Sequence, residues 1–213
     1  MTDQNLTHLY LLLDRSGSMQ SIKTDTEGGF AAFMEEQRRT PGECRVTLAQ
    51  FDNHYDVVYA DRPIADVPPL QLQPRGSTAL LDAMCKLITD AGAKLAAMKD
   101  DQRPETVIVA IMTDGHENAS QEWTHPAIKA LVEQQTGTYQ WQFLYMGADQ
   151  DAIEVGRNIG VAAANSVTYG RGKSRDVFAN ISDKVSTVRN ARAAGDAAAP
   201  MPAFTEQERR DLG

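Results

Sequence analysis

The chain has little of three things: cysteine, long apolar runs and excess positive charge. It contains two cysteines among 213 residues, Cys44 and Cys85, and neither belongs to a CxxC pair or has a histidine at metal-ligand spacing. We therefore expect both to be buried as small apolar side chains. The sequence predicts no disulfide and no zinc site.

The shortage of long apolar runs bears on membranes. No run approaches the roughly 20 residues that cross a bilayer. The start, MTDQNLTH, has no basic segment of the kind that opens a signal peptide. The hydrophobic fraction of 42% and the charged fraction of 23% are those of a globular protein in water. We expect a cytoplasmic protein that does not bind a membrane.

The charge balance argues against nucleic acid as a partner. The formal net charge is −8 and the pI is near 5.0, whereas binding to a phosphate backbone needs a basic face. Arg171, Lys173 and Arg175 form a local basic cluster. Because no aromatic residues are interleaved with them, a solvated helix start is the favoured interpretation.

Strand and helix patterns alternate along the chain. We expect strands at 8–13, 45–51, 55–60, 106–112, 139–146 and 166–169, and helices at 21–39, 79–99, 121–135, after GADQDA (147–152) and at 174–190. This alternation predicts an α/β fold with a mostly parallel sheet and helices on both faces. The short gap between 45–51 and 55–60 predicts a hairpin, so one strand is antiparallel.

The length fits one domain of ordinary size, which we place at residues 1–192. Four prolines make residues 61–75 a long loop. Gly28 and Gly29 interrupt the helix at 21–39 at a cost near 1 kcal/mol each, which we attribute to close packing against the sheet. After Arg192 the sequence AAGDAAAPMPA has few groups to bury, so we expect 193–213 to be a flexible tail. It ends in a possible short helix capped by Thr205 and Glu208.

Polar oxygen atoms follow the two most apolar runs. LYLLL, the apolar part of LYLLLDRSGSM (9–19), ends at Asp14. TVIVAIM (106–112) is followed by Thr113 and Asp114. In an open α/β sheet, ligands bind at the carboxyl ends of the strands, so the two carboxylates should face one crevice. Ser16 and Ser18 are two residues apart, which allows both hydroxyls to point the same way. Carboxylate and hydroxyl oxygens are suitable ligands for Mg²⁺.

Simpler interpretations exist for each of these residues. Asp, Ser and Gly are common in any turn that leaves a strand. Ser77 or Thr78 has the residue type of a helix cap. His116 and Glu117 have the residue types of a catalytic base and its partner, but HExxH is absent and exposed loop residues are the favoured interpretation.

Three segments resemble the parts of a known site. DRSGS (14–18), the threonine of RGSTALLDA (75–83) and the aspartate of MTDG (112–115) are similar to the metal-ion-dependent adhesion site (MIDAS) of von Willebrand factor A domains. The resemblance covers roughly residues 6–190 and includes the order of the elements. More weakly, GADQDA resembles a segment of stand-alone bacterial or phage A domains.

The resemblance implies a doubly wound, Rossmann-like sheet of order 3-2-1-4-5-6. It also implies a site for Mg²⁺ or Mn²⁺ made by the hydroxyls of Ser16, Ser18 and Thr78, with Asp14 and Asp114 binding directly or through water. In the family, an acidic group of a partner commonly completes the metal shell. The expected function is therefore a metal-dependent module that binds an Asp or Glu carboxylate of a partner protein, and not an enzyme.

Two alternatives remain. The first is a metal-dependent hydrolase or phosphotransfer enzyme that uses the same site. A phosphotransferase of the haloacid-dehalogenase type needs a second aspartate where this chain has Ser16, and the sequence shows no other nucleophile beside a base. The second alternative is a structural module that binds no metal.

Overall fold

Six strands form a single sheet in the computed structural model, which describes residues 2–213. The strands are β1 (Asp3–Asp14), β2 (Glu43–Phe51), β3 (Tyr55–Pro63), β4 (Pro104–Thr113), β5 (Gln142–Ala148) and β6 (Ser166–Tyr169). Their order is β3-β2-β1-β4-β5-β6, and every neighbouring pair is parallel except β2 and β3. The expected order, the parallel majority and the antiparallel edge strand are confirmed.

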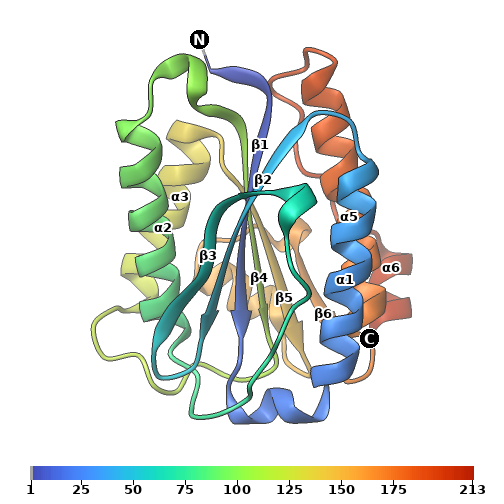
Figure 1. Cartoon of the computed structure of the whole chain (residues 1–213). Helices are drawn as coiled ribbons and strands as arrows, with labels where there is room; N and C mark the ends of the chain where they lie inside the picture. Colours follow the sequence, from blue (N-terminus) through green and yellow to red (C-terminus); the bar gives the residue numbers. More distant parts are fainter. Residues whose placement is uncertain (1) are drawn as a thin grey trace.

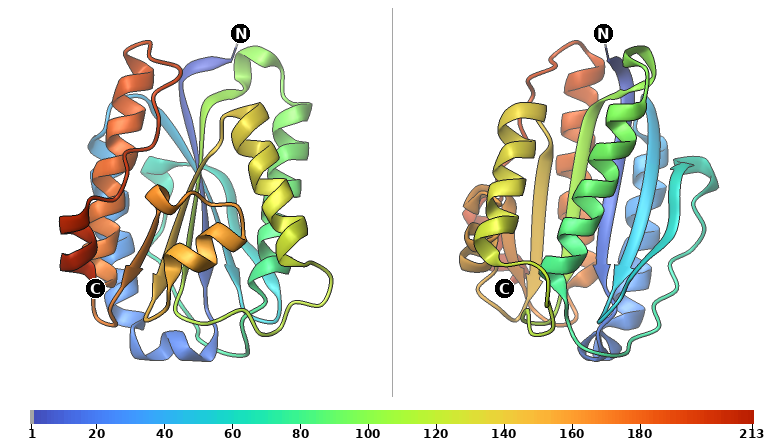
Figure 2. Two further views of the ribbon diagram at one scale, coloured as in Figure 1. Left: turned by 180° about the vertical axis from the view of Figure 1, so that it is seen from behind. Right: turned by 90° about the vertical axis from the view of Figure 1, so that its left-hand side faces the viewer.

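Helices cover both faces of the sheet. They are α1 (Lys23–Arg39), α2 (Leu80–Ala97), α3 (His125–Tyr139), α4 (Ala152–Asn158), α5 (Ser174–Ala193) and α6 (Glu206–Leu212). Figures 1 and 2 show α1 and α5 on one face and α2, α3 and α4 on the other. Along β1, Leu11 and Leu13 join the core under α1 and α5, whereas Tyr10 and Leu12 join the core under α2 and α3. Burial on both faces explains why this strand is an unbroken apolar run.

The two glycines of α1 mark a close contact between helices. A Cβ atom added to Gly29 would lie 2.7 Å from Cδ2 of Phe178 and 3.0 Å from Cα of Arg175, both on α5. A Cβ atom added to Gly28 would lie 2.9 Å from a guanidinium nitrogen of Arg175. Close packing is therefore the reason for these glycines, but the partner is α5 and not the sheet.

Two boundaries on the α3 side of the sheet differ from expectation. The helix expected at 121–135 begins at His125, because the carboxylate of Asp82 accepts backbone N–H groups of Gln121 at 2.8 Å and Trp123 at 2.9 Å and holds these residues in a loop. The helix then continues to Tyr139 and ends at Gln140, which has a left-handed conformation with φ 57°. The strand expected at 139–146 therefore begins only at Gln142.

Cys44 and Cys85 are both free and buried, as expected. Among residues 2–213, no helix combines the length and the apolar character that a bilayer crossing requires.

The C-terminal segment is exposed over residues 193–198, as its composition indicated, but packs on the domain further along. Ala199, Met201, Phe204 and Leu212 are all buried. The short terminal helix forms as α6, and Thr205 and Glu208 make the expected reciprocal cap. Met201, Phe204 and Leu212 join the core beside α5, so the end of the expected flexible tail is packed on the domain.

The docking site of this segment is the edge of the sheet. The backbone N–H of Phe204 donates to the carbonyl of Ala164 at 2.8 Å, and that of Gly170 donates to the carbonyl of Leu212 at 2.8 Å. Lys184 of α5 donates to the carboxylate of Glu208 at 2.8 Å. Since β6 is an edge strand, α6 covers groups that otherwise invite pairing with another chain.

A buried aromatic side chain tests this docking. Replacement of Phe204 by alanine should lower the free energy of unfolding by about 3 kcal/mol, because it removes a ring that is only 5% exposed. Chemical denaturation measures the change. Arg210, whose side chain is 64% exposed on α6, is the control, and Arg210→Ala should change stability by less than about 0.5 kcal/mol. Equal effects of the two substitutions would show that the segment does not dock.

Candidate metal centre

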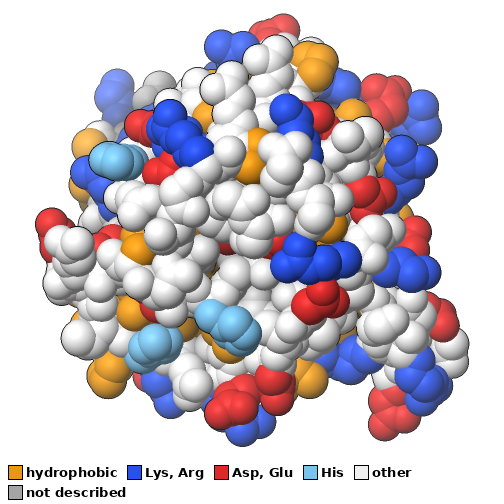
Figure 3. All heavy atoms as spheres, turned by 90° about the horizontal axis from the view of Figure 1, so that it is seen from below, with side chains coloured by type: hydrophobic (Ala, Val, Ile, Leu, Met, Phe, Trp, Pro, Cys, Tyr) orange, Lys and Arg blue, Asp and Glu red, His pale blue; other side chains and the backbone are white. Residues whose placement is uncertain are grey.

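The candidate site lies where β1 and β4 end. These two strands are neighbours at the centre of the sheet, and their register pairs Leu13 with Met112. Asp14 and Asp114 therefore leave the sheet at the same edge, as the sequence predicted. Seen from below (Figure 3), this end of the molecule consists mainly of uncharged polar side chains and backbone, with charged side chains in small mixed groups.

The first loop turns both serine hydroxyls to one side. The chain passes from β1 into a 3-10 helix, Gly17–Ser21. Oδ1 of Asp14 accepts the backbone N–H of Ser16 at 2.6 Å, and Oγ of Ser16 lies 3.0 Å from Oγ of Ser18. One oxygen of Asp14 thus has the turn-forming role of the simpler interpretation. Its other oxygen, Oδ2, accepts a hydrogen bond from Oγ1 of Thr113 at 2.5 Å.

Asp114 brings the second carboxylate to the serines. Oγ of Ser18 donates to Oδ1 of Asp114 at 2.6 Å. Oδ2 of Asp114 is buried and has no hydrogen-bond partner among the described residues. A guanidinium nitrogen of Arg171 lies 3.4 Å from this oxygen, which is ion-pair distance without a hydrogen bond. Buried carboxylate oxygens rarely stay unpaired, so this atom requires an explanation.

Thr78 completes the group and is not a helix cap. The residue that caps α2 is Ala79, and no side chain makes the cap hydrogen bond. Thr78 is 2% exposed, and its backbone N–H donates to Oδ1 of Asn118 at 2.9 Å. A Cβ atom added to Gly115 would lie 2.7 Å from Oγ1 of Thr78, 3.6 Å from Oγ of Ser18 and 3.7 Å from Oδ2 of Asp14. All three sequence segments therefore surround one point.

A buried aspartate on β2's turn joins the two loops that carry the hydroxyls. Oδ2 of Asp52 accepts hydrogen bonds from Nε of Arg15 at 3.0 Å and from Nε of Arg75 at 2.8 Å. The backbone N–H of Gly17 also donates to the carbonyl of Gly76 at 3.1 Å. Burial alone would raise the pKa of Asp52, but the hydrogen bonds from Arg75, the His54 backbone and Arg15 lower it to about 2. This charge stays in place at any ordinary pH.

The pKa values of the two carboxylates of the site, Asp14 and Asp114, are raised and not lowered. Burial raises the pKa of Asp14 to about 6, although hydrogen bonds from Thr113 and Ser16 favour the charged form. Burial also raises the pKa of Asp114, against the hydrogen bond from Ser18 and the charge of Arg171. Both groups would gain from a cation placed between them.

His116 and Glu117 do not form a catalytic pair. Oε1 of Glu117 accepts the backbone N–H groups of Ala119 at 2.9 Å and Ser120 at 2.7 Å, and Oε2 accepts that of Leu81 at 3.0 Å. His116 is exposed. The carboxylate therefore orders the loop after Asp114 and fixes it to α2.

Comparison with known proteins identifies the fold. No protein-family model matches the sequence, and no curated protein matches it significantly. Solved structures do match. A von Willebrand factor type A protein from Catenulispora acidiphila is 14% identical with a TM-score of 0.55, and the match covers 88% of this chain and 43% of that one. The vWF domain of the pilus tip protein Mfa5 from Porphyromonas gingivalis is 11% identical with a TM-score of 0.55, covering 88% and 96%. This chain has the von Willebrand factor A fold.

A third match is to a matrix protein. Proximal thread matrix protein 1 from the mussel byssus, in a structure with a zinc-occupied MIDAS motif, is 14% identical with a TM-score of 0.57. The match covers 90% of this chain and 47% of the mussel protein. The chain thus spans less than half of the mussel and Catenulispora chains. At these identities the likeness concerns the A fold.

The donor set fits a hard divalent ion. Its atoms are carboxylate and hydroxyl oxygens, which Mg²⁺ and Mn²⁺ prefer over nitrogen or sulfur. Residues 2–213 contain no cluster of three or more His, Cys, Asp and Glu side chains that could hold a metal. The unpaired Oδ2 of Asp114 and the missing Cβ of Gly115 leave both an acceptor and space for a cation.

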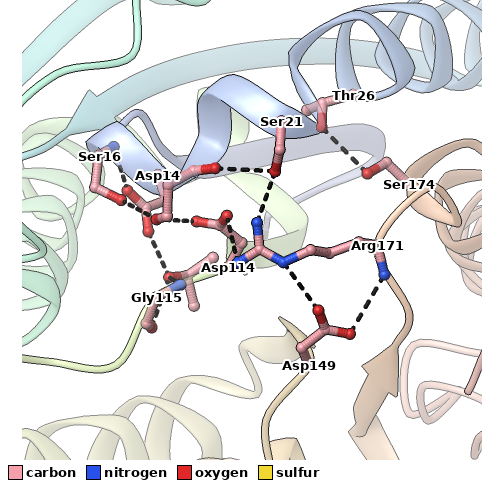
Figure 4. A network of polar contacts seen from close by, with 11 residues as sticks. Asp14, Ser16, Ser21, Thr26, Asp114, Gly115, Asp149, Arg171 and Ser174 are labelled. Carbon is pink, nitrogen blue, oxygen red and sulfur yellow. Dashed lines mark hydrogen bonds and ion pairs between the residues drawn. The ribbon is translucent and has the colours of Figure 1, made fainter.

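Several residues of this A fold site were not predicted from the sequence. Thr113 holds Asp14 and Asn118 holds Thr78. Thr113 is the last residue of β4 and Asn118 lies in the loop after it, so closeness to Asp114 in the sequence was the available signal. Arg171 comes from the loop after β6, and its guanidinium also contacts Asp149 and Ser21 (Figure 4). The sequence of that loop matches no motif for such a site, and its basic cluster is typical of a solvated helix start.

The space at Gly115 gives a direct test of the site. Gly115→Ala should weaken Mn²⁺ binding by about tenfold or more, because a methyl group 2.7 Å from Oγ1 of Thr78 forces that hydroxyl away. Isothermal titration calorimetry measures the affinity. Gly137→Ala is the matched control, since a Cβ there meets nothing within 4 Å. Unchanged affinity in Gly115→Ala would place the metal elsewhere.

The raised pKa of Asp14 predicts a pH dependence. Its ionisation destabilises the metal-free fold as the pH rises from about 4 to 6, because the pKa of about 6 exceeds that of the unfolded chain. A metal ion needs the ionised form, so the affinity for Mn²⁺ should fall about tenfold between pH 7 and pH 5. Titrations at both pH values measure this. Equal affinities would show that Asp14 is not a ligand.

Proposed function

We propose that this chain is a protein-binding module whose contact with its partner depends on a divalent metal ion. Asp14, Ser16, Ser18, Thr78 and Asp114 hold Mg²⁺ or Mn²⁺, the serines and the threonine through their hydroxyls. The bound ion supplies a Lewis-acid position for an anionic group. An Asp or Glu carboxylate of the partner protein takes that position.

One observation carries this proposal. Oδ2 of Asp114 is buried without a hydrogen-bond partner among the described residues, and the next residue, Gly115, faces Thr78, Ser18 and Asp14 at the position a Cβ atom would occupy. Two carboxylates balance the charge of a divalent ion and leave it able to attract a further anion. The hydroxyls contribute oxygen atoms without more negative charge. This balance favours an acidic ligand over a neutral one.

The comparisons support a protein as the partner. Among proteins with a similar fold, one is described as a pilus tip protein and another as a matrix protein with zinc in its MIDAS motif. These descriptions belong to those proteins. They agree with a role in contacts between proteins and with metal at the corresponding place.

We propose binding and not catalysis as the role of the site. A hydrolase that uses the metal needs a nucleophile or a base aimed at the ion. Glu117, the acidic residue closest in sequence to Asp114 on that loop, is engaged with backbone N–H groups. The hydroxyls near Asp114 bond to one another or to carboxylates, without a histidine between them.

We also propose a cytoplasmic location and a stand-alone domain of the bacterial or phage type. The first is supported by the two free, buried cysteines, which suit a reducing compartment. The second is supported by the GADQDA segment. Cell fractionation with an antibody to the chain tests the location.

Substitutions of Thr78 and of its neighbour Ser77 should affect partner binding differently. A chelator and Thr78→Ala should both release the native partner from the immobilised protein, because each removes metal coordination. Ser77→Ala should retain the partner. Among the described residues the Ser77 hydroxyl has no hydrogen bond, and the backbone N–H of Ser77 donates to Oδ1 of Asn53 at 2.7 Å. Affinity purification from the native cell, with quantitative mass spectrometry, measures the retained partner.

The same variants distinguish the alternatives. A partner that survives both the chelator and Thr78→Ala would show that the metal site is not the binding surface. Metal-dependent hydrolysis of generic phosphate or ester substrates, abolished in Asp114→Ala, would instead establish an enzyme. Calorimetric unfolding with and without Mn²⁺ shows whether the parent protein binds the ion, because an ion at 100 times its Kd stabilises the fold by about 2.7 kcal/mol.

A further inference from the structure

The guanidinium of Arg171 stands at the metal site although it belongs to a distant loop. One of its terminal nitrogens lies 3.4 Å from Oδ2 of Asp114, the buried oxygen that has no hydrogen bond. Figure 4 shows the guanidinium between Asp114 and Asp149. No other Lys or Arg forms an ion pair with Asp14 or Asp114 among residues 2–213. Arg171 is therefore the positive charge that the protein itself provides to the site.

The side chain is held in this place by several contacts. Nε of Arg171 donates to Oδ2 of Asp149 at 2.9 Å, and Nη1 donates to Oγ of Ser21 at 2.6 Å. Asp149 has a left-handed backbone conformation, with φ 48°, and its N–H donates to the carbonyl of Tyr169 at 3.0 Å. A non-glycine residue keeps such a conformation only when its surroundings fix it. Arg171 is thus more ordered than a surface arginine with a 41% exposed side chain would otherwise be.

The loop that carries Arg171 is itself anchored. The N–H of Gly170 donates to the carbonyl of Leu212 at 2.8 Å, and the N–H of Lys173 donates to the carbonyl of Gly170 at 3.0 Å. The C-terminal helix α6 therefore fixes the residue that precedes Arg171. Because these hydrogen bonds already order the guanidinium, little further conformational entropy is lost when it lies beside Asp114.

We infer that Arg171 competes with the metal ion for Asp114 and thereby lowers the metal affinity of the site. This inference rests on the proposed metal-binding function. The guanidinium neutralises Asp114 in the absence of metal, but it makes no hydrogen bond to Oδ2, so that oxygen remains able to bind an ion. A divalent ion that enters meets the repulsion of a fixed positive charge. The protein therefore trades metal affinity for stability of its metal-free form.

The direction of the effect separates competition from a structural role. Arg171→Gln should bind Mn²⁺ about five- to tenfold more tightly than the parent, the size expected for removing one charge beside a divalent ion in a partly exposed site. If Arg171 only ordered the loop, the same substitution would weaken binding. Arg171→Lys keeps the charge and should bind Mn²⁺ with nearly the parent affinity.

Lys173 provides the matched control. It lies on the same loop and pairs with Asp176 at 3.2 Å, without contact to Asp114. Lys173→Gln removes the same unit charge and should change the Mn²⁺ affinity by less than about twofold, because exposed charges are screened over a Debye length near 10 Å. Calorimetric titration of Mn²⁺ into each variant, with circular dichroism to confirm folding, makes the comparison.

The outcomes are distinct for the inference and for the proposed function. Tighter binding in Arg171→Gln than in Lys173→Gln supports the inference, also when the parent itself binds too weakly to measure. Equal or weaker binding in Arg171→Gln overturns it while the metal site stands. If Mn²⁺ binds to none of the parent and variant proteins, the proposed function fails and the inference fails with it.

Discussion

The burial of two carboxylates side by side, at the ends of β1 and β4, is the constraint on which this end of the molecule depends. Removing a carboxylate from water costs several kcal/mol unless hydrogen bonds or a cation compensate. Asp14 is compensated by the Ser16 N–H and by Thr113, and Asp114 by Ser18 and the guanidinium of Arg171. Even so, burial raises the pKa of both carboxylates. Two buried carboxylates share one guanidinium, so the site keeps a negative charge that a cation would balance.

The loops that carry the proposed hydroxyl ligands are joined by a third buried carboxylate, Asp52, which is not one of the proposed ligands. Asp52 joins Arg15, which sits between Asp14 and Ser16, to Arg75, which begins the segment that leads to Thr78. Its low pKa keeps this link charged. Because the two loops are fixed before any ligand arrives, binding does not require them to be ordered at that moment. If the two loops were flexible, ordering them on binding would cost conformational entropy and weaken the affinity.

The sequence predicted the parts of this structure that follow from the spacing of apolar residues and from local residue type. β1 and β4 are buried on both faces and are continuous apolar runs in the sequence. Asp14, Ser16, Ser18, Thr78 and Asp114 lie close together, and their role as metal ligands stays a prediction. The sequence did not predict features that depend on contacts between distant residues. The start of α3 is delayed by the carboxylate of Asp82, and the C-terminal segment docks because its few apolar side chains match the edge beside β6. Composition counts such side chains but does not show the surface that receives them.

The C-terminal segment connects the stability of the fold to the electrostatics of the site. α6 covers the β6 edge, and its last carbonyl accepts the N–H of Gly170, the residue before Arg171. Arg171 in turn stands beside the unpaired oxygen of Asp114. The position of this charge therefore depends on a C-terminal segment that, among residues 2–213, makes no hydrogen bond or ion pair with the proposed ligand residues. Coupling of this kind needs only a rigid loop between two anchored ends, and the left-handed Asp149 and the Leu212 contact supply both anchors.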